Sequence, residues 1–250
     1  MFYPLFFTKI NRSTQNDKGV RHFLQLNYLL HLIAGCISVL LFWIYSVNYP
    51  LQLSGIVYLL VIVVVVLYYW KSPIPQWNLF GASIVFGVIV FIRSIREIVQ
   101  LTPLWPGVFI GLLSTGIIAI STLLFVASIW KKFAKSVNLS IIPSILKTLI
   151  LLLGIRIVWD LVILFNVQIG DQNGILMSVY QFFMQNDILY FLLTMLFGLI
   201  IPLIIAIVWM KKDKSFDTKK IFLLSFSLLI IIWFSEFFYK YFLLQYGVAI

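Results

Sequence analysis

The chain has 250 residues, of which 62% are hydrophobic and only 10% are charged, and its mean hydropathy is +1.08. This composition excludes a soluble globular domain and indicates an integral membrane protein. Apolar runs of about 20 residues or more can cross a hydrocarbon core of about 30 Å, where backbone polar groups must be bonded within helices. We therefore predict an all-α, polytopic membrane helical bundle.

The chain order begins with a polar N-terminal segment. Residues 1–22 contain an apolar patch too short for a signal-peptide core, so we predict a cytoplasmic tail there. Residues 23–250 are predicted to form a single transmembrane helical domain. Its seven predicted spans are 23–47, 51–70, 78–101, 104–130, 142–168, 186–210 and 220–246.

The net charge of +10 is explained by membrane topology. Fourteen of the 18 Lys and Arg residues fall in the N-terminal tail or toward one set of helix ends. The alternate connections, near Tyr49, near Thr102 and from Gln168 to Asn186, contain none. The positive-inside rule then places the N-terminus in the cytoplasm and the C-terminus outside. No nucleic-acid partner is expected, and the lipid bilayer is the predicted environment.

The cysteine and histidine residues offer little for metal or haem chemistry. Cys36 is the single cysteine, so neither an intramolecular disulfide nor a cysteine-based metal cluster is expected. His31 follows Asn27 by one helical turn, and His22 lies too far along the same helix to bind the same haem iron. We expect no haem, no metal and no covalently bound cofactor. His31 is either a packing residue or a group that handles protons.

Three pairs of a base and an acid, each four residues apart, lie inside predicted spans. They are Arg93 with Glu97, Arg156 with Asp160, and Glu236 with Lys240. Four residues are about one helical turn, so each pair lies on one helix face and can partly neutralise itself. Arg93, Asp160 and Glu236 each lie roughly 15 Å below the outer end of their span. We predict that the pairs form one polar cluster, which is either a functional pocket or a set of interhelical salt bridges.

Two further features bear on the architecture. Pro202 interrupts the sixth span and is predicted to bend it. Trp105, in the proline-rich turn before the fourth span, is predicted to be an interfacial tryptophan at an ordinary helix end, although it could also form the rim of an entry site. Tyr239 lies between the acid and the base of the last span and is the aromatic residue of most interest.

The sequence "SEFFYKYFLL" resembles the last helix of the membrane-anchor subunits of dimethyl sulfoxide reductase, within the polysulfide-reductase-like group of quinol-reactive proteins. Their Gly-Glu-x-x-x-Arg-x-x-Phe-Tyr ending would place its acid at Glu236 and its base at Lys240. "FIRSIREIVQLTPLWPGVF" is similar to the family's arginine and proline-containing turn, with Arg93 at the arginine. "RIVWDLVIL" supplies Asp160 at a later acid. The resemblance covers residues 78–250.

The chain also departs from that family. It lacks a His-Leu-Gly-x-Pro element, and its seven predicted spans are one fewer than the eight helices that the family generally has, so we expect the first family helix to be missing. Removing the first helix of the family would leave seven spans with the C-terminus outside, as the charges also predict. Lys240 keeps the positive charge of the family's arginine but not its planar, bidentate geometry.

The resemblance implies a subunit that binds and oxidises quinol, either menaquinol or another quinol, in the bacterial or archaeal cytoplasmic (inner) membrane during anaerobic respiration. It implies an iron–sulfur subunit that receives the electrons and a molybdopterin catalytic subunit, so that the isolated chain would catalyse nothing alone. Asp160 and Glu236 would be the catalytic proton acceptors. The implied quinol-binding residues are Arg93, Glu97, Arg156, Lys240, Tyr239 and His31.

The alternative is a non-enzymatic membrane protein that uses the charged cluster for packing or for binding a substrate. Such a protein would be a transporter or an assembly or structural subunit. Transporters often contain inverted repeats and several broken helices. The chain has one proline inside a predicted span and no clear repeat, which disfavours a transporter.

Overall fold

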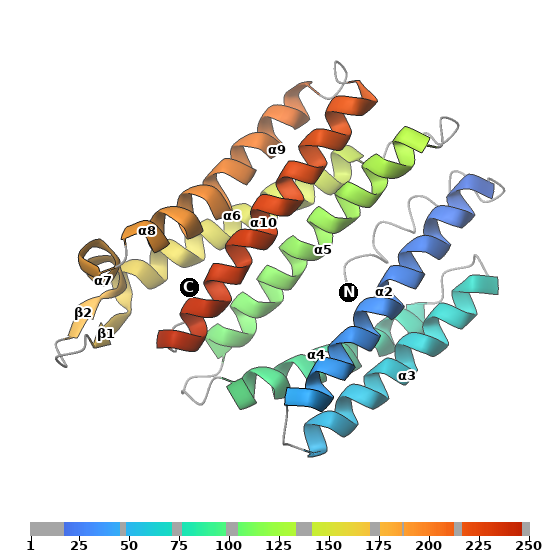
Figure 1. Cartoon of the computed structure of the whole chain (residues 1–250), viewed down its shortest axis with the longest axis horizontal. Coiled ribbons are helices and arrows are strands. Elements are labelled where there is room, and N and C mark those ends of the chain that lie inside the picture. The colour runs from blue at the N-terminus through green and yellow to red at the C-terminus, as the bar shows by residue number, and fades with distance from the viewer. Residues whose placement is uncertain are drawn as a thin grey trace. The chain divides into compact units, whose positions relative to one another are not determined.

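The computed structural model describes residues 18–45, 49–71, 77–98, 105–133, 142–170, 176–186, 188–212 and 217–246. Long helices make up most of this part of the chain (Figure 1). The long α-helices are α2 (Lys18–Tyr45), α3 (Tyr49–Lys71), α4 (Trp77–Ile98), α5 (Trp105–Phe133), α6 (Ile142–Asn166) and α10 (Thr218–Tyr246). The shorter elements are β1 (Gln168–Gly170), β2 (Leu176–Ser178), α7 (Val179–Asn186), α8 (Ile188–Phe191), the π-helix η1 (Leu192–Ile200) and α9 (Ile201–Lys212).

Five helical segments are long and apolar enough to cross a membrane. They are Pro50–Tyr68, Trp105–Lys131, Ile142–Asn166, Leu192–Lys211 and Thr218–Tyr241. The prediction of an all-α, polytopic membrane helical bundle is confirmed at this level. Two more long helices, α2 and α4, fill the other two predicted ranges. The count of seven spans and the orientation of the termini stay predictions.

The first helix begins earlier than predicted. Helix α2 starts at Lys18, so the last residues of the predicted tail are helical, while residues 1–17 lie outside the described part of the chain. Polar residues beyond the apolar run can continue a helix, and no proline stands at this boundary to end it. Hydropathy locates the apolar stretch of a helix and not its polar extension.

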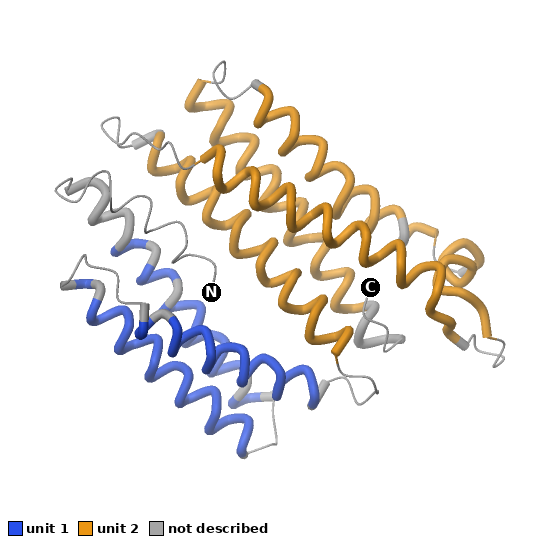
Figure 2. The backbone as a smooth tube through the Cα atoms, turned by 180° about the vertical axis from the view of Figure 1, so that it is seen from behind, with its two compact units in different colours: residues 1–100, 133–141 blue, residues 101–132, 142–250 orange. Residues whose placement is uncertain are grey.

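The chain divides into two compact units (Figure 2). Unit 1 comprises residues 1–100 and 133–141, and within it α3 packs against both α2 and α4. Unit 2 comprises residues 101–132 and 142–250 and contains α5, α6, η1, α9 and α10. In unit 2, η1 packs against α10, and α6 packs against α9.

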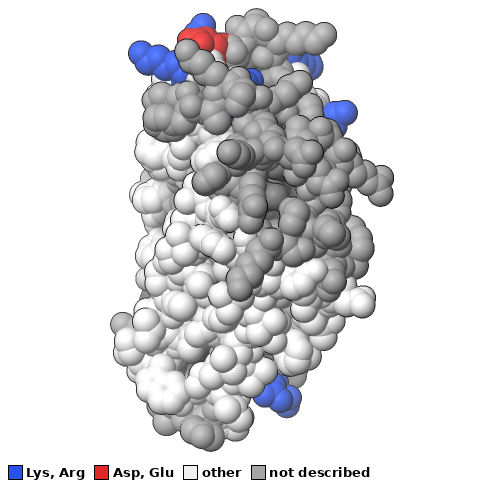
Figure 3. Space-filling model, turned by 90° about the vertical axis from the view of Figure 1, so that its right-hand side faces the viewer, with Lys and Arg blue, Asp and Glu red and all other residues white. Residues whose placement is uncertain are grey.

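Basic residues gather at one end of unit 2. Helices α5 and α9 end there and α10 begins there (Figure 1), which brings together Lys131, Lys211, Lys219 and Lys220. In the space-filling view, the described side chains across the broad middle of the visible face are neither basic nor acidic (Figure 3). Helices that cross hydrocarbon show this distribution of charge.

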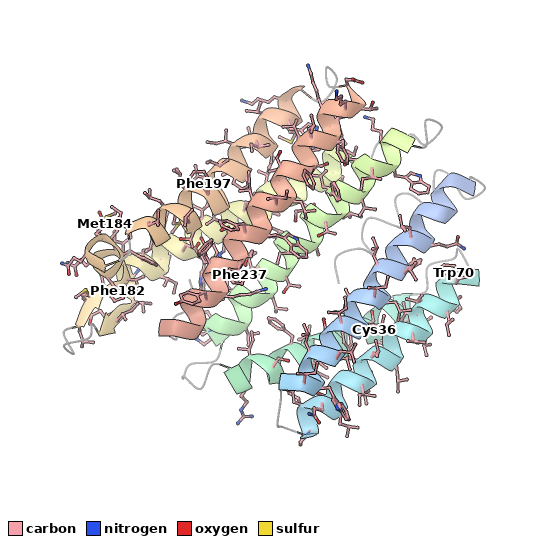
Figure 4. All side chains as sticks on the ribbon, in the orientation of Figure 1. Cys36, Trp70, Phe182, Met184, Phe197 and Phe237 are labelled. Carbon is pink, nitrogen blue, oxygen red and sulfur yellow. The ribbon has the colours of Figure 1, made fainter. Side chains whose placement is uncertain are left out.

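A small hairpin follows α6 at the opposite end of unit 2. Strands β1 and β2 are antiparallel, with Ile169 paired to Met177. Helix α7 follows directly and packs against α6, with Phe182 and Phe183 buried. Figure 4 shows Phe182 and Met184 on α7. The intervening sequence "DQNGI", residues 171–175, contains an Asn-Gly pair, which favours turns between strands.

The sixth predicted span consists of a π-helix followed by an α-helix. Pro202 is the second residue of α9 and follows η1 directly. Proline has no backbone N–H to donate to the carbonyl of Gly198, four residues earlier, and its ring clashes with that carbonyl in a regular α-helix. The wider turns of η1 accommodate this break, and π-helical segments occur frequently at functional sites.

Candidate functional site

A cluster of ionisable side chains is buried in unit 2. Helix α6 contributes Arg156 and Asp160, which are 1% and 0% exposed. Helix α10 contributes Glu236 and Tyr239, which are 4% and 6% exposed. Spacings of four and three residues place each pair on one face of its helix. We call these four residues the ionisable cluster.

Arg156 joins three helices of unit 2. Its Nε lies 3.1 Å from Oδ1 of Asp160 and donates to Oδ2 at 3.3 Å, so the predicted pair on α6 forms. Its Nη1 donates to Oγ of Ser114 on α5 at 2.6 Å. Its Cζ lies 4.1 Å from the centroid of the Tyr239 ring on α10, within the range of a cation–π interaction. The guanidinium is therefore held by a carboxylate, a hydroxyl and an aromatic face.

Tyr239 connects α10 to both α6 and η1. Its hydroxyl lies 2.8 Å from Oδ2 of Asp160 and 3.3 Å from the carbonyl oxygen of Thr194. One phenolic proton serves one acceptor at a time, and the shorter contact with the carboxylate is the stronger hydrogen bond. Ser235 also contacts the Thr194 carbonyl, at 3.4 Å from its Oγ. The π-helix thus supplies a backbone acceptor beside the ionisable cluster.

Glu236 is buried without the partner that the sequence suggested. The side chain of Lys240 is exposed, and within the described residues it forms no ion pair with Glu236. A four-residue step rotates by about 40° around a helix, and a long lysine side chain can direct its ammonium away from a buried neighbour. Glu236 instead interacts electrostatically with Arg156 and Asp160. Its Oε2 has no hydrogen-bond partner among the described residues.

The residue that follows Glu236 on α10 faces outward. Phe237 is 68% exposed (Figure 4) and follows the buried acid directly. On the next turn, Tyr239 is buried and Lys240 is exposed. The helix therefore separates one inward face, which carries Glu236 and Tyr239, from an outward face with aromatic and basic residues.

The remaining predicted site residues belong to unit 1. Arg93 lies on α4 with an exposed side chain. The side chains of Glu97 and His31 lie outside the described part of the chain. The inclusion of Arg93 and Glu97 in one cluster with Arg156, Asp160 and Glu236 stays a prediction, as does the assignment of His31 to the quinol-binding set.

Aromatic side chains lie beside the α6 part of the ionisable cluster. Trp159 directly precedes Asp160, and its ring packs edge-on against Trp105, with centroids 5.5 Å apart. Phe109 packs against the same ring at 4.7 Å. Trp105 is 62% exposed, as an interfacial tryptophan at a helix end would be.

Sequence reasoning missed Ser114 and the carbonyl of Thr194. Serine is common in membrane helices, and Ser121 and Ser128 recur on α5 at the same seven-residue spacing, so no local signal distinguishes Ser114. Whether a backbone carbonyl is free to accept a hydrogen bond from a side chain depends on helix geometry, and the residue types do not reveal it. Only Pro202, eight residues later, indicated irregular geometry in this segment.

The cluster has the chemical groups for proton binding and for holding a polar ligand. Carboxylates accept protons, and arginine and tyrosine donate hydrogen bonds to oxygen. Among the described residues, no three His, Cys, Asp or Glu side chains form a group that could hold a metal ion. No protein-family model, no curated protein and no solved structure matches the chain.

Proposed function

We propose that the chain is the membrane-anchor subunit of a multisubunit oxidoreductase and that it binds and oxidises quinol beside the ionisable cluster. One observation carries the proposal: two carboxylates and a guanidinium are buried together in helices long enough to cross a membrane. Ionisable groups cost about 2.5–3.5 kcal/mol each at the centre of an inserted helix, and they mark functional sites more often than packing sites. The resemblance of residues 78–250 to reductase anchors supplies the reaction class.

The proposed chemistry assigns roles to groups of this chain. Oxidation of a quinol to a quinone releases two electrons and two protons. Asp160 or Glu236 takes a proton from the quinol, and both protons then leave on one side of the membrane. Arg156 and Tyr239 are placed to donate hydrogen bonds to a ligand oxygen. The electrons pass to an iron–sulfur partner, and from there to a molybdopterin subunit. Arg93 and Lys240 enter the quinol-binding set through the resemblance, Glu97 through its spacing from Arg93, and His31 as a polar residue of the first predicted span.

The proposal places the protein in a bacterial or archaeal inner membrane with seven spans. The basic end of unit 2 faces the cytoplasm, and the hairpin of β1 and β2 faces outward. The described part of unit 2 supports this arrangement because Lys131, Lys211, Lys219 and Lys220 lie at one end and the hairpin at the other.

The test uses the full chain, purified with its partners from the native membrane. An iron–sulfur protein should co-purify, and the complex should oxidise a water-soluble menaquinol analogue. Asp160→Asn and Glu236→Gln should each lower the rate about 100-fold or more while the complex stays assembled, since general acid–base groups contribute about 10²–10⁴-fold. Asp217→Asn, at the exposed start of α10, is the control and should retain the wild-type rate. Full activity in both cluster variants would remove the proposed proton roles, and absence of any iron–sulfur partner would reject the anchor function.

A second candidate is a structural role for the cluster in a non-enzymatic membrane protein. The observation in its favour is that Arg156 contacts Ser114, Asp160 and Tyr239, and so ties α5, α6 and α10 together. A purely structural cluster predicts that Asp160→Asn lowers stability and that the wild-type complex has no quinol oxidation to lose. Measuring unfolding and quinol oxidation on the same preparations separates the two candidates.

A further inference from the structure

The ionisable cluster contains more acids than bases. Asp160 and Glu236 are both buried, and Arg156 is the one buried base beside them among the described residues. If all three groups were ionised, the cluster would carry one uncompensated negative charge. In a low-dielectric interior such a charge is costly unless another positive charge neutralises it.

The elements packed around Glu236 supply no second base within the described residues. Helix α6 presents Arg156 and Asp160, and α10 itself presents Tyr239. The π-helix η1 has the sequence "LLTMLFGLI", which contains no charged or titratable side chain. The other described basic side chains of the surrounding helices lie toward the opposite end of unit 2, namely Lys131 on α5, Lys147 on α6, Lys211 on α9, and Lys219 and Lys220 on α10. Lys240 is exposed and forms no ion pair with Glu236.

Two carboxyl oxygens of the ionisable cluster accept no hydrogen bond from the described residues and could therefore carry a proton. Oδ2 of Asp160 accepts from Tyr239 and from Arg156. Oδ1 of Asp160 and Oε2 of Glu236 are both buried and have no hydrogen-bond partner among the described residues, although Oδ1 forms the ion pair with Arg156. Tyr239, which donates to Asp160, lies one helical turn from Glu236 on the same face of α10, so both buried carboxyl groups belong to one site.

We propose that Asp160 and Glu236 together bind one proton in the resting protein, so that the ionisable cluster is electrically neutral. Arg156 balances one negative charge, and the shared proton balances the other. The site is then a proton-binding site inside the membrane bundle, and it does not depend on quinol chemistry. When this proton leaves, another positive charge must enter or the helices must rearrange, because the remaining charge is buried.

Infrared spectroscopy of the full chain in lipid vesicles tests this proposal. A neutral carboxylic acid has a C=O stretching band that is distinct from carboxylate bands and that shifts on exchange into D2O. The wild-type protein should show such a band at neutral pH. Glu236→Gln and Asp160→Asn should each abolish it, because Arg156 then balances the single remaining acid. A shared proton therefore predicts loss of the band in both variants.

Two further variants serve as controls. Asp217→Asn removes an exposed carboxylate and should leave the band unchanged. Lys240→Gln should also leave it unchanged, whereas a change would show that Lys240 helps to neutralise the cluster and would contradict the proposal. If the cluster variants fail to fold, the wild-type spectrum still tests whether a proton is held: the band must be present at neutral pH and disappear on alkaline titration, and its absence would reject the proposal.

Three other results would overturn the proposal. Absence of the band from the wild-type protein at neutral pH would show that no proton is held. Survival of the band in either cluster variant would show that the other acid carries the proton by itself. Appearance of the band only after Na⁺ is replaced by choline would show that a metal cation supplies the missing charge. A wild-type band without quinol oxidation would keep this inference and reject the proposed function.

Discussion

At the scale of single residues, the Tyr239 hydroxyl connects the charged part of unit 2 to the rest of the bundle. It contacts Asp160 at 2.8 Å and the Thr194 carbonyl at 3.3 Å, and its ring covers Arg156. A hydrogen bond to an ionised group is worth about 1.5–3 kcal/mol, more than a bond between neutral groups. A single hydroxyl therefore contributes to stability and to the orientation of the acid.

Replacing Tyr239 with phenylalanine removes that hydroxyl and keeps the ring over Arg156. We expect Tyr239→Phe to lower the free energy of unfolding by about 1–3 kcal/mol, because Asp160 loses a donor in a buried site. Denaturant titration of the protein in detergent measures the change. Tyr180→Phe, on an exposed residue of α7, is the matched control and should change stability by less than about 0.5 kcal/mol. Equal effects of the two changes would remove the special role of the Tyr239 hydroxyl.

Removing Arg156 should have a larger effect than removing Tyr239. Arg156→Gln leaves two buried acids without a base, and breaking a buried ion pair by deleting one partner costs about 3–5 kcal/mol. Arg96→Gln, on an exposed side chain of α4, should be nearly neutral. The comparison is made by thermal unfolding at fixed pH. A small effect of Arg156→Gln would mean that the acids do not depend on the guanidinium for their charge balance.

At the scale of elements, the contact between η1 and α10 depends on a glycine, Gly198, which has no side chain. A Cβ added to Gly198 would overlap the side chain of Ser235, and it would lie 2.5 Å from the Ser235 Cβ. The two helices approach this closely only because residue 198 is glycine, as small residues allow in membrane helix packing. The same contact brings the Thr194 carbonyl to Tyr239.

Gly198→Ala should therefore push η1 away from α10 and cost about 1–3 kcal/mol of stability, in the range for overpacking a tight contact. Adding Ser235→Gly should recover most of the loss, because it removes the side chain that the new Cβ meets. A double-mutant cycle of unfolding free energies measures this coupling. Gly154→Ala, where nothing lies within 4 Å of an added Cβ, is the control and should be neutral or stabilising by up to about 1 kcal/mol. Additive effects of the two changes would contradict the proposed contact.

At the scale of the whole molecule, the position of the basic residues predicts the orientation in the membrane. In a Cys36→Ser background, Thr218→Cys places a thiol at the basic end of unit 2 and Gln181→Cys places one on α7. We expect a membrane-impermeant thiol reagent to label Gln181→Cys in intact cells and Thr218→Cys only after permeabilisation, since basic ends stay in the cytoplasm. The reverse labelling pattern would invert the proposed topology.

Much of the helical architecture was predictable because hydropathy depends on local composition. Each of the seven predicted ranges contains a long helical segment, and five segments have the length and apolarity of membrane spans. The hairpin of β1 and β2 was not predicted, because its strands have only three residues each and carry no alternating pattern of useful length. The π-helix was also missed, since Pro202 indicated a break and not the type of helix that would precede it.

The candidate site was predictable only within a single helix. The spacing of Arg156 and Asp160 correctly predicted their ion pair, because residues four apart on a helix are neighbours whatever surrounds them. The same reasoning was wrong for Glu236 and Lys240, where tertiary packing buries the acid and exposes the base. Spacing shows which residues share a helix face, and it cannot show which face turns toward the bundle.

The sequence by itself determined that this is a helical membrane protein. It also determined the approximate ranges of the helices and the ionisable residues within them. These properties follow from composition and from contacts within one helical turn. The tertiary structure alone decided that Tyr239 meets Asp160, that Ser114 meets Arg156, and that Glu236 is enclosed beside one base. These contacts join residues 42 to 79 positions apart. They depend on how each helix is rotated about its axis and how closely its neighbours approach, and no local pattern encodes either.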